Sequence, residues 1–129
     1  MGEDSFILAS ESRRRKKILK LINLNFQAMP SKLEESKVKI TNNQPHLYCM
    51  EMSHLKAKII SKQYMNNYVI GADTIVYCEN TILEKPKNNS EAKKFLNQLS
   101  NNKHTVYTGV SVMHFNNKTN IQFYDKTDI

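Results

Sequence analysis

Short apolar runs alternate with segments of helical periodicity along this chain, and this alternation restricts the possible folds more than any other feature. Strands are expected at residues 6–9, 25–29, 68–70, 75–77, 82–83, 105–113 and 119–123, and helices at residues 13–24, 47–62 and 90–99. Residues 32–44 are polar and are expected to form a loop. Helices and strands that alternate in this way give an α/β or α+β class.

The second half of the chain carries the clearest periodicity. Four apolar residues share one face of the last expected helix, which Ser90 is suited to cap: Ala92, Phe95, Leu96 and Leu99. Residues 105–113 alternate like a strand, and the asparagines at 116–117 predict a turn from which residues 119–123 return. Residues 71–74 are expected to interrupt the strand that precedes them.

Length and composition indicate one soluble domain spanning residues 1–129. No apolar run approaches the roughly 20 residues that a membrane-spanning helix requires. The acidic start and the short apolar run at residues 6–9 argue against a signal peptide, so the cytoplasm is the expected compartment. Cys49 and Cys78 lack metal-binding spacing, which predicts reduced structural thiols.

The formal net charge is +7 at pH 7. Such a charge attracts an anionic partner, which could be a nucleic acid, an acidic surface or a phosphorylated small molecule. Charge alone does not choose among the three. Many of the lysines lie beside asparagine pairs, and this composition is typical of surface loops.

A basic turn follows the first expected strand. Ser10 and Ser12 precede a run of cations at residues 13–17, in the first turns of the expected helix. Cations at a helix N-terminus oppose the helix dipole, and a bound anion would relieve the conflict. Hydroxyl, guanidinium and backbone N–H groups could therefore converge here on a phosphate chain. The simpler alternative is a basic run on the surface.

Asp73 is the second feature that invites a functional interpretation, because it lies within an apolar strand segment after Gly71. A carboxylate is costly to bury unless it holds a cation, a metal or a water. A structural aspartate at the end of a strand is the alternative. Four further charged residues are scattered along the chain, where solvated charge is the simpler interpretation of each alone: Glu34, Glu35, Lys56 and Lys85.

Together, four segments resemble the Maf family in order and spacing. Residues 8–19 (L-A-S-E-S-R-R-R-K-K-I-L) resemble the Maf opening L-A-S-x-S-P-R-R-x-x-L-L, and residues 69–76 (V-I-G-A-D-T-I-V) resemble its central V-I-G-A-D-T-V-V. Residues 82–86 (I-L-E-K-P) resemble I-L-G-K-P. Residues 92–110 follow A-x-x-x-L-x-x-L-S-G-x-x-H-x-V-x-T-G-V.

The sequence departs from the family pattern at three positions. Arg13 replaces a proline, Glu84 replaces the glycine before Lys85, and Asn101 replaces a glycine. None of the three removes a group expected to act in catalysis. Maf proteins continue into a second portion with a G-E-P-x-D-K-A-G-A-Y-G-I-Q-G-like stretch, so the chain resembles their N-terminal and central part.

The resemblance implies a mixed central sheet flanked by helices, as in inosine triphosphate pyrophosphatases, with a nucleotide cleft. It also implies hydrolysis of a nucleoside triphosphate to a monophosphate and pyrophosphate, aided by a divalent cation such as Mg²⁺. Asp73 matches the proton acceptor of the family, and Glu34 or Glu35 would assist Asp73 at the metal. The positions expected to grip phosphate are Ser10, Arg14, Arg15, Lys56 and Lys85.

Base choice is implied by the same resemblance. Arg14 and Thr74 match positions linked to it, and A-D-T rather than S-D-Q favours the branch that acts on dTTP and UTP over the branch that acts on 7-methyl-GTP. Modified pyrimidine nucleotides are also compatible with this branch. A homodimer is the expected assembly.

Two other classes of function remain open from the sequence. One is a basic nucleic-acid-binding module around residues 13–17, which is disfavoured because the segment lacks interleaved aromatic residues. The other is a catalytically inactive Maf-like fragment. No membrane association and no stable nucleic-acid partner are expected.

Overall fold

The computed structural model describes residues 6–35, 38–40, 43–100 and 102–129. The acidic start, parts of the expected loop at residues 32–44 and the Asn101 substitution therefore lie outside the described residues. The described elements are β1 (Phe6–Leu8), α1 (Arg13–Leu21), β2 (Phe26–Ala28), α2 (Pro45–Gln63), β3 (Tyr68–Cys78), β4 (Thr81–Leu83), α3 (Asn89–Leu99), β5 (His104–His114) and β6 (Thr119–Asp128).

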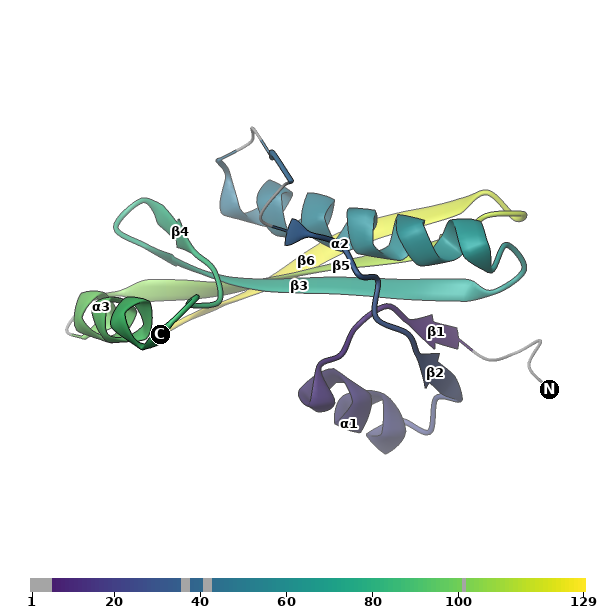
Figure 1. Ribbon diagram of the computed structural model, residues 1–129, viewed down its shortest axis with the longest axis horizontal. Helices are drawn as coiled ribbons and strands as arrows, with labels where there is room; N and C mark the ends of the chain where they lie inside the picture. Colours follow the sequence, from purple (N-terminus) through teal and green to yellow (C-terminus); the bar gives the residue numbers. More distant parts are fainter. Residues whose placement is uncertain (1–5, 36–37, 41–42, 101) are drawn as a thin grey trace.

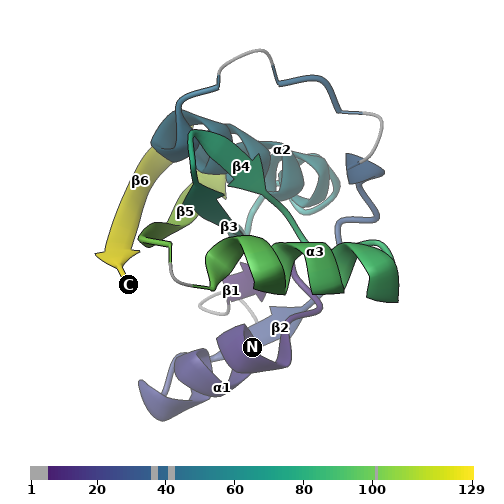
Figure 2. The same ribbon diagram turned by 90° about the vertical axis from the view of Figure 1, so that its left-hand side faces the viewer.

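All six described strands form one mixed sheet, as the resemblance implied. The strand order is β2-β1-β3-β5-β6, and β4 pairs with β3 outside this path. The strands β2, β1 and β3 run parallel, whereas β4, β5 and β6 pair antiparallel. The helix α2 lies along one face of the sheet, and α1 and α3 lie on the other side (Figures 1 and 2).

The connections that link β1 to its two neighbouring strands run over different faces of the sheet. From β1 it passes through α1 to β2 on one side, and from β2 it returns through α2 to β3 on the other (Figure 1). The neighbours of β1 are thus reached over opposite faces of the sheet. In open α/β sheets, a crevice forms beyond the carboxyl end of a strand at which the connections diverge in this way.

One edge of β3 is only partly covered. Because β5 occupies one edge along most of the strand, β1 and β4 must share the other edge. The strand β1 pairs with residues 68–70 and β4 pairs with residues 76–78. The stretch at residues 71–75 is left between them, and this gap lies beyond the carboxyl end of β1.

The expected interruption at residues 71–74 is wrong, because β3 is continuous and pairs with β5 throughout this stretch. Gly71 has a packing role instead. A Cβ at Gly71 would lie 2.2 Å from the carbonyl oxygen of Ser53, and one at Gly109 would lie 2.3 Å from that of Cys49. The two glycines let the backbone of α2 approach β3 and β5 closely.

The core lies between α2 and the sheet and includes Ile7, Ala57, Ile60 and Val69. The opposite face is less covered: Leu21 of α1 is 81% exposed, although the sequence places it on an apolar helix face. Both cysteines are buried and unpaired, as predicted. Among the described helices, none has the length and apolar character needed to cross a membrane.

Most element boundaries agree with the sequence to within a few residues, and one helix cap differs. The last helix begins one residue earlier than predicted, and its N-cap is Asn88, whose side chain accepts a hydrogen bond from the backbone N–H of Glu91. Ser90 lies inside the helix. The strand β6 extends to residue 128, because it pairs with β5 along its whole length.

The contact between α2 and the sheet generates a prediction about Gly71. Gly71→Ala should destabilise the fold by at least about 2 kcal/mol, because the added methyl group meets backbone atoms of α2 that cannot move individually. Urea unfolding of the two proteins measures the difference. Ser111→Ala is the control, since Ser111 is buried on β5 and its hydroxyl has no hydrogen-bond partner among the described residues. Equal stability of Gly71→Ala and wild type would contradict the close approach.

Candidate active site

A cleft of about 720 Å³ opens at the uncovered stretch of β3. The β1–α1 turn forms one end of the cleft, the segment after β4 forms the other, and α2 forms a wall. Its lining residues are Ser10, Glu11, Ser12, Arg15, Glu35, Val38, Tyr48, Lys56, Asp73, Thr74, Ile75, Glu84, Lys85 and Lys87. The cleft is therefore assembled from five separate segments of the chain.

At the β1–α1 end of the cleft, serine hydroxyl groups form hydrogen bonds with Arg15 of the basic turn. Ser12 caps α1 by accepting a hydrogen bond from the backbone N–H of Arg15 at 3.3 Å. The guanidinium of Arg15 donates to Ser10 Oγ at 3.2 Å and to Thr74 Oγ1 at 3.0 Å. Arg15 therefore ties the β1–α1 turn to β3 and lies in the cleft together with the N-terminus of the helix.

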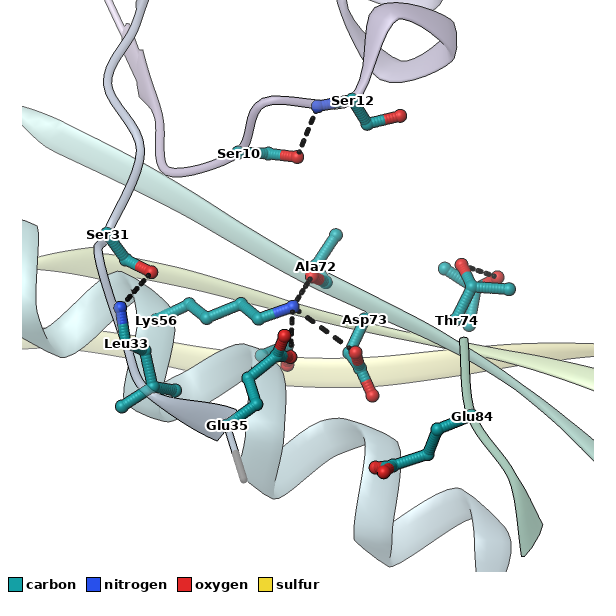
Figure 3. Close-up of polar contacts among 12 residues, drawn as sticks. Ser10, Ser12, Ser31, Leu33, Glu35, Lys56, Ala72, Asp73, Thr74 and Glu84 are labelled. Atoms are coloured by element: carbon teal, nitrogen blue, oxygen red, sulfur yellow. Dashed lines mark hydrogen bonds and ion pairs between the residues drawn. The ribbon is translucent and has the colours of Figure 1, made fainter. Parts of the chain in front are cut away.

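Lys56 lines the cleft, and Figure 3 shows its ammonium group among Glu35, Ala72 and Asp73. Its ammonium group contacts Glu35 Oε1 at 3.0 Å and Asp73 Oδ1 at 3.2 Å, and it donates to the carbonyl oxygen of Ala72 at 3.4 Å. The Lys56 side chain is only 15% exposed. Because α2 approaches β3 closely over Gly71, the lysine reaches the edge of the strand and joins the residue 31–35 segment to it.

Asp73 is buried beside this lysine, with its side chain 12% exposed. Burial raises the pKa of Asp73 above its ordinary value, and the nearby Lys56 ammonium opposes the rise. One carboxylate oxygen contacts Lys56, whereas Oδ2 is buried and has no hydrogen-bond partner among the described residues. Buried polar atoms are rarely left without a partner, so this oxygen is available to a water, a metal ion or a substrate group.

The other end of the cleft contains a contact between α2 and the segment after β4. The hydroxyl of Tyr48 donates a hydrogen bond to Glu84 Oε1. Burial raises the pKa of Tyr48, and the neighbouring carboxylates, Glu84 first, add to the rise. Lys85 and Lys87 line the same end.

The structure brings together seven of the residues predicted from the sequence: Ser10, Arg15, Glu35, Lys56, Asp73, Thr74 and Lys85. It does not bring Arg14 or Glu34 into the lining of the cleft, and both are exposed on the chain nearby. Sequence reasoning missed Tyr48, Glu84 and Lys87 as lining residues. Tyr48 precedes Lys56 by eight residues, so helical spacing could have placed them on the same side of α2.

The acidic groups in the cleft are compatible with a divalent cation held jointly by protein and substrate. Within the described residues, no cluster of three or more His, Cys, Asp or Glu side chains is placed to hold a metal ion. Asp73 and Glu35 nevertheless converge on Lys56, and Asp73 Oδ2 has no hydrogen-bond partner in the part of the chain that the structure describes. Mg²⁺ commonly binds one or two carboxylates and completes its shell with water and substrate phosphates.

The fold is similar to that of two solved structures. It matches the structure of the Staphylococcus aureus Ham1 protein with a TM-score of 0.62 and 14% identity, over 96% of this chain and 70% of the other. It also matches a nucleoside-triphosphatase, or dITP/XTP pyrophosphatase, of Mycobacterium abscessus with a TM-score of 0.64 and 11% identity, over 96% and 72% of the two chains. At these identities, the similarity establishes the fold alone.

Comparison of the sequence identifies the family of the chain, which is more specific than the fold. Residues 5–129 match the profile of the Maf-like protein family, and the chain therefore belongs to the Maf family. A dTTP/UTP pyrophosphatase of Geobacillus sp. (strain WCH70) is 41% identical over 128 residues, or 95% of this chain and 68% of the relative. One of Lachnoclostridium phytofermentans is 45% identical over 118 residues, or 90% of this chain and 58% of the relative.

The burial of Asp73 generates a prediction about stability and pH. The folded protein holds the Asp73 proton more tightly than the unfolded chain does, so wild type should lose stability as the pH rises from about 4, the ordinary value for Asp, through the raised pKa. Asp73→Asn should remove this loss and be at least as stable as wild type at pH 7 to 8.

Urea midpoints measured across a pH series check this expectation. Asp125→Asn is the matched control, because Asp125 is exposed on β6. If wild type instead gained stability over Asp73→Asn between pH 4 and pH 8, the ion pair with Lys56 would outweigh burial and the expectation would be wrong.

Proposed function

We propose that this chain carries the catalytic part of a nucleoside triphosphate pyrophosphatase that acts on dTTP and UTP. One observation carries the proposal: Asp73 lines the cleft beside Lys56, and its buried Oδ2 has no hydrogen-bond partner among the described residues. The names of the similar dTTP/UTP pyrophosphatases support it. The chain spans 58% and 68% of the length of these two relatives, so the activity of the whole protein is part of the proposal.

The arrangement divides the substrate between the two ends of the cleft. The phosphate chain would lie at the β1–α1 turn, where Ser10, Arg15 and the N-terminus of α1 provide hydrogen-bond donors for an anion. Lys85 would reach the phosphates from the opposite side. This placement lets positive groups stabilise the charge that develops on the leaving pyrophosphate.

Asp73 would accept the proton of the attacking water. The water oxygen forms a bond to the α-phosphorus, the bond from this phosphorus to the bridging oxygen breaks, and the products are the nucleoside monophosphate and pyrophosphate. A carboxylate with a raised pKa is a better base near neutral pH than an ordinary one. Lys56 would hold the carboxylate in position through its contact with Oδ1.

A divalent cation, Mg²⁺ in this proposal, would be held by Asp73 with help from Glu35. Such an ion neutralises negative charge on the phosphates and orients them. Glu34, the other expected ligand, lies outside the cleft lining, so Glu35 is the stronger choice of the two. A homodimer and a cytoplasmic location belong to the same proposal, and sedimentation and cell fractionation would test them.

The nucleic-acid-binding alternative has less support, because Arg15 turns into the cleft and contacts Ser10 and Thr74. An inactive Maf-like fragment is the remaining alternative. It differs from the proposal in one measurable outcome, which is whether any triphosphate is hydrolysed.

Pyrophosphate binding tests the phosphate end of the cleft. Arg15→Ala should lose more than half of the rise in melting temperature that pyrophosphate produces in wild type, because two donors of the anion site disappear. Arg14→Ala removes an equal charge from the exposed side of the same helix and should lose less. Equal losses in the two variants would show that the positive charge of α1, rather than the Arg15 contacts, holds the anion.

Turnover tests the role of Asp73. With Mg²⁺ and either dTTP or UTP, Asp73→Asn should release pyrophosphate at least about 10²-fold more slowly than wild type, as expected for loss of a positioned base. Melting curves must show that the variant is folded. Full activity of the folded variant would contradict the mechanism, and faster turnover of 7-methyl-GTP than of dTTP or UTP would contradict the proposed base choice.

A further inference from the structure

The ion pair between Lys56 and Glu35 lies where the cleft meets a second, smaller cavity. This cavity of about 240 Å³ lies between the β1–α1 turn and the residue 31–35 segment. The cleft and the cavity share four lining residues: Ser10, Glu11, Glu35 and Lys56. The ion pair therefore forms part of the boundary between the two spaces, and a change of partner by either residue would alter this boundary.

The three charged groups at this boundary are held with different firmness (Figure 3). Lys56 belongs to α2 and Asp73 to β3, and their side chains are 15% and 12% exposed. Glu35 lies in the connection between β2 and α2, and its side chain is 50% exposed. Glu35 is therefore the member of the group that can change its position at the smallest cost in packing.

Lys56 occupies an oxygen that a divalent cation would also use. Glu35 Oε1 lies 3.0 Å from the Lys56 ammonium nitrogen. A magnesium ion binds its oxygen ligands at about 2.1 Å, so an ion on Oε1 would lie within about 5 Å of the ammonium group. Two cations at this distance repel each other strongly in a partly buried site. The metal and Lys56 therefore compete for Glu35.

Asp73 does not impose the same competition, because its two oxygens are used differently. Oδ1 contacts Lys56 at 3.2 Å, whereas Oδ2 has no hydrogen-bond partner among the described residues. One carboxylate can thus hold the lysine on one oxygen and a metal ion on the other. Of the two acidic residues, Glu35 is the one whose present contact has to break.

We propose that Glu35 exchanges partners, pairing with Lys56 in the free protein and moving to the divalent cation when a metal-bound triphosphate enters the cleft. Lys56 keeps Asp73 Oδ1 and turns its freed N–H group to a substrate phosphate. The free protein consequently binds the metal alone weakly, and the metal enters together with the nucleotide. This inference rests on the proposed function, which assigns both ligands to the cleft.

The charges explain why the exchange is coupled to the substrate. In the free protein, the single positive charge of Lys56 is shared by two carboxylates. If Glu35 left without a new cation, or if Lys56 lost it without a new anion, a partly buried charge would lose a partner, and this is costly. A triphosphate with its metal supplies the cation and the anion at once.

A double-mutant cycle on metal affinity tests the exchange. Calorimetry with Mn²⁺ alone would compare wild type, Lys56→Gln, Glu35→Gln and the double variant. Lys56→Gln should raise the Mn²⁺ affinity at least about tenfold more in the presence of Glu35 than in the Glu35→Gln background, because only the first change releases a ligand. Equal gains in the two backgrounds would overturn the proposal, since Lys56 would then act only as a general positive charge.

Lys87→Gln is the matched control, because it removes the same charge from the cleft lining outside the Lys56 ion pairs. Its gain in Mn²⁺ affinity should be the same with Glu35 and with Gln at position 35. If Lys56→Gln is unfolded without metal, Mn²⁺ should restore its helical circular dichroism, because the ion replaces the missing cation. Failure of Mn²⁺ to refold such a variant would also overturn the proposal.

The metal measurement separates this inference from the proposed function, because it requires neither nucleotide nor hydrolysis. If wild type hydrolyses no triphosphate but the tenfold coupling is found, the proposed function fails and the competition of Lys56 and metal for Glu35 stands. If wild type releases pyrophosphate but the gains are equal in the two backgrounds, the exchange fails alone.

Discussion

The close approach of α2 to the sheet is the constraint on which the rest of the site depends. Gly71 and Gly109 leave room for the α2 backbone at β3 and β5, and no side chain larger than hydrogen fits there without movement. This short separation lets Lys56 reach the edge of β3. Lys56 in turn makes the burial of Asp73 tolerable and joins the residue 31–35 segment to the strand. The position of the Lys56–Asp73 pair therefore depends on the packing of α2 against the sheet.

The charges of the cleft differ from those of the whole chain. The chain carries a formal net charge of +7, whereas the cleft lining contains four basic residues, Arg15, Lys56, Lys85 and Lys87, and four acidic ones, Glu11, Glu35, Asp73 and Glu84. Most of the excess positive charge thus lies on other surfaces. There it can attract an anionic ligand from a distance, while the balanced cleft orients the ligand through individual contacts.

Much of the fold was predictable from the sequence, because strand and helix periodicities are local signals. Asp73 and the basic turn could also be singled out as candidates from the sequence, since each is a charge pattern that conflicts with its local structure. The contacts between distant segments were not. The residues next to Arg14 and Arg15 in the sequence do not show which of the two guanidinium groups enters the cleft. Their orientation depends on the Ser12 cap and on Thr74, which is distant in the sequence. The interruption expected at residues 71–74 was wrong, because Gly71 does not break the strand. It makes room for the backbone of α2, and this contact cannot be read from the strand pattern.

Adjacent residues of β3 serve opposite faces of the sheet. Asp73 points to Lys56 beneath α2, and Thr74 meets Arg15 from the α1 side. The face of the sheet on which each of these side chains lies therefore depends on its position along the strand. An insertion or deletion of one residue before Asp73 would exchange the two faces, and it would also place a side chain where α2 tolerates only hydrogen. Evolution can thus replace individual residues around this strand, but it cannot change the length of the strand leading to Asp73 without losing the helix contact and the site together.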